Sequence, residues 1–183
     1  MKRFKIKESI NKIDLWTLIG LIPFIFALHE FEEWNILSWH RKYQSNIPEV
    51  TDLHLQIIFV FLIAIIFLTF LILKRFKNRK TSAYIFFPIL SLLIYNGVVH
   101  LFWSIYFSSY SPGLIFGFII SCPYIGYIVY RMISERLISK FYFSVWLIVF
   151  IILFINTIIN SDKLEAGILY AMLLGKLFAD CLF

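Results

Sequence analysis

The residues that could do chemistry in this sequence begin with His29-Glu30-Phe31-Glu32-Glu33. One imidazole and three carboxylates here end an apolar run, residues 15–28, which only Thr17 interrupts. As a helix, this run reaches about 21 Å, less than the roughly 30 Å hydrocarbon core of a bilayer. A carboxylate inside that core costs roughly 2.5–3.5 kcal/mol on insertion scales. Three in one turn therefore need a compensating metal ion, proton or water-filled cavity.

Helical spacing brings three of these groups to one face. Positions i, i+3 and i+4 are neighbours on a helix, so His29, Glu32 and Glu33 can converge on one point. Glu30 is rotated by about 100° from them. We expect His29 and Glu32 to be metal ligands and Glu33 to be the general base, although the two glutamates could exchange these roles.

A later apolar run supplies two more polar groups. Asn96 and His100 are four residues apart and share a helix face. Two imidazoles and a carboxylate suit a divalent metal, with zinc favoured and iron as the alternative. We therefore expect His100 to join His29 and Glu32 as a ligand. Asn96 is expected to orient His100 or to bind substrate.

Tyr110 follows the second polar run in a short turn. It could donate a hydrogen bond to a developing oxyanion or anchor the turn, and anchoring is the favoured interpretation. A bound zinc ion would activate water for hydrolysis, whereas iron would favour oxidation.

The elements that must position these residues are membrane spans. The chain is 61% hydrophobic with a mean hydropathy of +0.84, and 183 residues could not hide that much apolar surface in a soluble fold. We expect an all-α, polytopic helical bundle of about six transmembrane helices in a single domain, residues 1–183. After a basic tail (residues 1–14), the expected spans are residues 15–39, 53–73, 83–107, 113–132, 141–159 and 165–182.

The basic residues indicate the orientation. The N-terminal tail, residues 74–80 and residues 131–140 hold all but four of the 17 lysines and arginines. This bias places the N-terminus inside, and we expect an integral protein of a bacterial cytoplasmic membrane. Because the charges flank apolar runs, the net charge of +6 is no reason to expect nucleic acid as a partner.

This orientation places the polar groups at a common depth. His29, Asn96, His100 and Asn156 fall about 20–26 Å along their spans from the inner side. We therefore expect them to form one site in the outer half of the bilayer, where membrane lipid and a lipid-soluble or lipid-linked substrate can reach it.

Two further features have simpler interpretations. His40 and His54 are expected at the interface rather than as ligands. A stripe of small residues in the last run favours close packing within the fold or in a homo-oligomer. Its members are Gly167, Ala171, Gly175 and Ala179.

The motifs resemble the HXXEE-motif family of small multi-span membrane proteins. They are His29/Glu32/Glu33, Asn96/His100 and Tyr110/Pro112/Gly113. The resemblance covers roughly residues 10–135. It implies a candidate membrane enzyme whose motif residues form the active site, and it supplies no reaction.

The expected function is a metal-dependent integral membrane enzyme, with hydrolysis favoured over oxidation. Two alternatives stay open. Glutamate and histidine in a dry pocket could move protons without a metal, as in an isomerase. Intramembrane Glu and His could also relay protons or bind ions in a coupled transporter.

Overall fold

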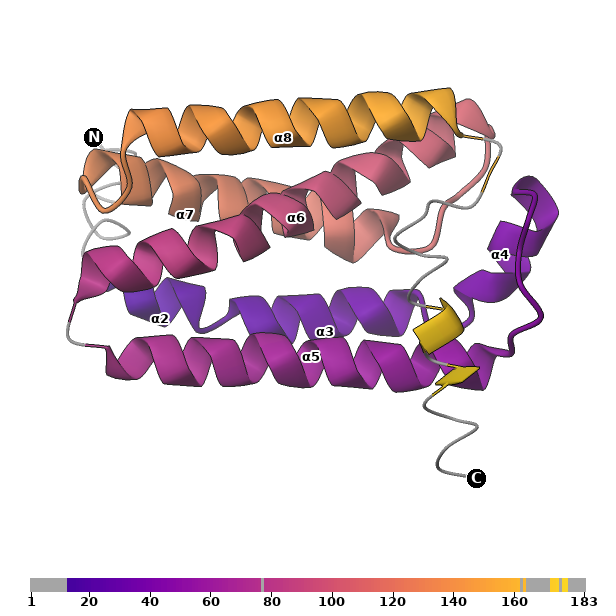
Figure 1. Cartoon of the computed structure of the whole chain (residues 1–183), viewed down its shortest axis with the longest axis horizontal. Helices are drawn as coiled ribbons and strands as arrows, with labels where there is room; N and C mark the ends of the chain where they lie inside the picture. Colours follow the sequence, from indigo (N-terminus) through magenta and orange to yellow (C-terminus); the bar gives the residue numbers. More distant parts are fainter. Residues whose placement is uncertain (1–12, 77, 162, 164–171, 175, 178–183) are drawn as a thin grey trace, which may run out of the picture.

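The computed structural model describes residues 13–76, 78–161, 163, 172–174, 176 and 177, and their main elements are helices. In chain order these are α2 (Leu15–Ile19), α3 (Ile22–Glu32), α4 (Ile36–Tyr43), α5 (Asp52–Arg75), α6 (Arg79–Tyr106), the π-helix η1 (Leu114–Ser121), α7 (Cys122–Ser134) and α8 (Lys140–Ile159). Figure 1 shows α3 and α5 side by side along one face of the bundle and α8 along the opposite face, with α6 crossing between them.

Five described segments are long and apolar enough to cross a membrane, which confirms the all-helical membrane class. They are Leu15–Glu32, Asp52–Arg75, Arg79–Tyr106, Leu114–Ser134 and Lys140–Ile159. Large apolar side chains on α8, such as Ile148 and Ile152, are exposed, as lipid-facing residues are. The expected sixth span, residues 165–182, falls mostly outside the described residues, and so does the stripe of small residues within it.

The first span is shorter than the expected residues 15–39. Its membrane-length part ends at Glu32, and the polar helix α4 begins separately at Ile36. The backbone N–H of Glu33 donates to the carbonyl of His29, and that of Trp34 to Phe31, so a tight turn ends α3. Sequence periodicity did not reveal this turn, because residues 33–35 contain neither proline nor glycine.

Two glycines allow α6 and η1 to touch. A Cβ atom on Gly97 would lie 2.3 Å from the Gly117 carbonyl oxygen and 2.7 Å from the Cys122 Sγ atom. The two backbones therefore approach more closely than any larger side chain permits.

A π-helix of this length is unusual, and π-helical turns often occur at functional sites.

Candidate metal centre

Glu33 lies between two histidines from different helices. Its Oε1 atom is 2.9 Å from His29 Nε2 and 2.7 Å from His100 Nε2. One donor atom of each residue falls within 4.8 Å of the others, and all three side chains are buried. The common site expected for His29 and His100 therefore exists, with Glu33 as its carboxylate.

The end of α3 explains this convergence. His29 lies in the last turn of α3, and Glu33 is the residue that directly follows the helix. The pair keeps the i, i+4 spacing of a helix and presents both side chains to α6, where His100 is buried. Burial inside the bundle removes water from all three groups, so each depends on the others for polar contacts.

Two residues hold the histidine rings. The Ser111 hydroxyl is 3.1 Å from His100 Nδ1, and the Asn96 amide nitrogen is 2.7 Å from His29 Nε2. Asn96 was expected to orient His100, but the structure places it on His29. Ser111, which holds His100 instead, was missed because a serine in a turn carries no distinctive sequence signal.

Glu32 lies apart from the histidines, contrary to its expected role as a ligand. Its carboxylate accepts hydrogen bonds from the backbone N–H groups of Ile115 (3.0 Å) and Phe116 (2.8 Å) and from the Tyr110 hydroxyl. The first N–H groups of a helix lack internal partners and attract negative charge. Glu32 therefore caps η1, and Glu33 takes the place beside the histidines that was expected for Glu32.

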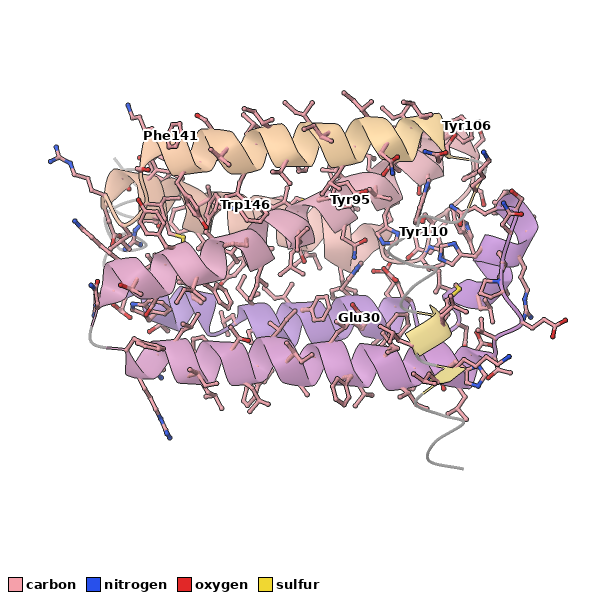
Figure 2. The ribbon with its side chains drawn as sticks, viewed as in Figure 1. Glu30, Tyr95, Tyr106, Tyr110, Phe141 and Trp146 are labelled. Atoms are coloured by element: carbon pink, nitrogen blue, oxygen red, sulfur yellow. The ribbon has the colours of Figure 1, made fainter. Side chains whose placement is uncertain are left out.

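Tyr110 anchors the loop between α6 and η1. Its hydroxyl donates to Glu32 while its ring is exposed, which agrees with the favoured interpretation of this residue. Figure 2 shows it at the same end of the bundle as Glu30 of α3.

The loop between α6 and η1 ends at Gly113, where φ is +92°. A Cβ atom there would lie 2.5 Å from Glu33 Oε1, so only glycine lets the loop cover the site.

A cavity of about 160 Å³ adjoins Glu33 and His100 of the converging cluster. Its polar lining residues are Glu30, Glu33, His40, Asn96 and His100. Helix α5 supplies part of the apolar lining, including Leu55, Phe59 and Leu62. The cavity is therefore amphipathic, because two histidines and two glutamates face a small space that also has an apolar wall.

His40 is a cavity residue that the sequence analysis assigned to the interface. It is 1% exposed, its Nδ1 atom lies 2.6 Å from Gln44 Oε1, and its ring packs edge-on against Trp103. The sequence did not predict that His40 faces the cavity, because the turn after α3 breaks the helical register between Glu33 and His40.

Two other polar residues lie away from the site. His54 accepts a hydrogen bond from the Thr51 backbone at the start of α5, which makes it a capping residue. Asn156 was expected at the common depth, but it is exposed on α8 and receives a hydrogen bond from Asn160. Equal depth did not imply convergence for this residue, because its side chain points away from the bundle interior.

The burial of His40 predicts a pH-dependent stability. Burial lowers the pKa of His40 to about 4, against the opposing hydrogen bond with Gln44 and the nearby charge of Glu33. The unfolded chain binds this proton near pH 6.5, so the free energy of unfolding should fall by up to about 3 kcal/mol between pH 7 and pH 4. Denaturation in detergent micelles should show a shallower pH slope for His40→Gln. Equal slopes for the two proteins would contradict the prediction.

Comparison with known proteins adds a family to this geometry. A family model described as a protein of unknown function with an HXXEE motif matches residues 20–128, more than half of the chain. No curated protein and no solved structure matches. The matched segment includes His29, Glu33, Asn96, His100 and Ser111.

Proposed function

The chain belongs to the HXXEE-motif family, and we propose that its motif residues hold a divalent metal in a membrane enzyme that hydrolyses a lipid-soluble or lipid-linked substrate. The single observation that carries this proposal is the convergence of His29 Nε2, Glu33 Oε1 and His100 Nε2 beside a cavity. Two imidazoles and one carboxylate form the kind of ligand set that leaves positions open at catalytic zinc.

The two imidazole nitrogens and the carboxylate oxygen of this cluster are chemically suited to bind a divalent metal. Ser111 occupies Nδ1 of His100 and leaves Nε2 facing Glu33, and holding the second ring nitrogen is how proteins usually orient a ligating histidine. Among the described residues, His100 Nε2 and Glu33 Oε1 have no polar partner outside the His29–Glu33–His100 cluster. Ligands at 2.0–2.2 Å around a tetrahedral ion are about 3.4 Å apart, so the separations of 2.7 and 2.9 Å between Glu33 and the histidines would lengthen by about 0.5–0.7 Å.

Each residue then has a distinct task. His29, His100 and Glu33 would hold the ion, which would supply Lewis-acid activation of water or of a substrate oxygen. Asn96 contacts the nitrogen that would bind the ion, so its amide would turn toward the cavity and become available to a substrate. Glu32 and Tyr110 would act indirectly, by fixing the loop that carries Ser111 and Gly113.

The surroundings support a lipid-soluble or lipid-linked substrate. The cavity has an apolar wall on α5, and the α5 face beyond it carries exposed residues such as Val60 and Phe61. A substrate dissolved in the bilayer would meet this face without crossing water. The distribution of basic residues supports a cytoplasmic N-terminus, which would place the site toward the outer leaflet.

Metal analysis of the purified protein tests the proposal. We expect about one zinc ion per wild-type chain and at least a tenfold loss in His29→Ala and in His100→Ala. His54→Ala is the matched control, because His54 caps α5 and should not affect metal content. Chelation should also abolish hydrolysis of fatty-acyl nitrophenyl esters in mixed micelles. Full occupancy in both histidine variants would exclude these ligands.

Direct hydrogen bonding favours a second candidate, a metal-free acid–base isomerase. The separations of 2.7 and 2.9 Å are those of hydrogen bonds between imidazole and carboxylate, and Asn96 already occupies His29 Nε2. Such a network could take a proton from one carbon of a substrate and return it to another. Proton–deuterium exchange into an unsaturated lipid that survives chelation would support this candidate over the metal enzyme.

A further inference from the structure

Glu30 is a buried carboxyl group that the proposed metal site does not use. Its side chain is 4% exposed and lines the cavity beside Glu33. Its Oε2 atom is buried without a hydrogen-bond partner among the described residues. Figure 2 shows Glu30 on α3, at the end of the bundle that holds the candidate site.

The other two glutamates of the motif differ from Glu30 in this respect. Glu32 accepts hydrogen bonds from two backbone N–H groups and a tyrosine, and Glu33 contacts two histidines. An unpartnered buried polar atom costs about 1–3 kcal/mol, and more if it is charged. The Oε2 atom of Glu30 carries this cost among the described residues, and a ligand in the cavity could satisfy it.

The same cavity contains an unpartnered donor. The indole Nε1–H of Trp103 is buried and has no hydrogen-bond partner in the part of the chain that the structure describes, and Trp103 also lines the cavity. The lining thus leaves both a carboxyl oxygen and an N–H group without partners. A hydroxyl group suits such a lining, because it donates one hydrogen bond and accepts others. It also matches Glu30 in either protonation state, since it can donate to a carboxylate or accept from a carboxylic acid.

The size and wall of the cavity define the rest of the ligand. A cavity of about 150 Å³ is known to hold benzene, so about 160 Å³ accommodates a hydroxyl group and roughly six attached heavy atoms. The wall from Leu55, Phe59 and Leu62 would contact an apolar portion. Water alone could fill the polar end but would leave this wall without apolar contact.

We propose that the cavity binds the hydroxyl-bearing end of an apolar compound, with Glu30 as the residue that contacts the hydroxyl group. This inference rests on the proposed function where it identifies the compound as the substrate or the alcohol product of hydrolysis. The binding itself requires only Glu30 and the cavity, so it can be tested apart from the metal.

Protection from chemical modification tests the inference on the full chain in detergent. N,N′-Diisopropylcarbodiimide is a small apolar reagent that modifies carboxylic acids, and mass spectrometry of peptides locates the adduct. We expect modification at Glu30 and protection by 1-hexanol at about a tenfold lower concentration than by 1-fluorohexane, which has the same chain without the hydroxyl group. The exposed Glu49 is the internal control and should show no protection.

The outcomes separate this inference from the metal enzyme. Equal protection by the two compounds, or no modification of Glu30, would overturn the hydroxyl site. Glu30→Gln should lose the adduct at residue 30 and keep its metal, whereas Glu33→Gln should keep the difference between the alcohol and the fluoride. Selective protection in a protein without metal would leave the hydroxyl site standing and remove the proposed metal enzyme.

Discussion

Glu33→Gln should lower the amount of bound metal at least tenfold, whereas Glu32→Gln should leave it unchanged. The two substitutions are chemically identical and one residue apart, but only Glu33 lies between His29 and His100. A neutral amide would lack the negative charge with which Glu33 would hold the proposed divalent ion beside two neutral imidazoles. Elemental analysis after identical purification, reported per chain, measures the difference.

Glu32→Gln should instead weaken the fold. Its amide nitrogen cannot accept a hydrogen bond, so Ile115 or Phe116 loses a backbone partner at the start of η1. We expect the free energy of unfolding to fall by about 1–2 kcal/mol. Equal metal loss in both variants would contradict the assignment of Glu33 to the metal and of Glu32 to η1.

Gly97→Ala should destabilise the protein by about 3 kcal/mol or more. The added methyl group would lie 2.3 Å from the Gly117 carbonyl oxygen, which belongs to the backbone and cannot rotate away. Helix α6 and η1 would have to separate, and overpacking of this kind is among the costlier core changes. Unfolding followed by tryptophan fluorescence in detergent measures the loss.

Gly126→Ala is the matched control for that substitution. Gly126 also lies within a helix, α7, but a Cβ atom there would meet nothing within 4 Å. The same change should be neutral or slightly stabilising, because alanine favours helix more than glycine does. Similar behaviour of the two alanine variants would show that the contact between α6 and η1 does not limit stability.

The sequence was sufficient to predict the membrane class and the meeting of His29 with His100. Both predictions rest on regular features, namely apolar runs of spanning length and the constant rise of a helix. Depth along a span follows from counting residues, so two groups at similar depth on neighbouring helices could be expected to approach. Asn156 shows the limit of this reasoning, because depth says nothing of which way a side chain faces.

Which of Glu32 and Glu33 lies beside the histidines could not have been decided from the sequence. Both residues lie on the same helix face as His29, and spacing alone cannot separate i+3 from i+4. The choice depends on η1, whose N–H groups attract Glu32, and nothing in the apolar composition of residues 114–121 distinguishes a π-helix from an α-helix. His40 was missed for a similar reason, since a short turn changes the register before it.

The π-helix makes the length of its segment matter more than its composition. Each π-turn closes one residue later than an α-turn, so deletion of a single residue within Leu114–Ser121 would restore ordinary pitch and rotate the following helix by about 100°. A deletion before Gly117, where a Cβ atom would lie 2.8 Å from the His29 ring, would also move this glycine away from the imidazole. Substitutions at exposed positions such as Ile119 should be tolerated during evolution. Insertions and deletions within Leu114–Ser121 should be removed by selection.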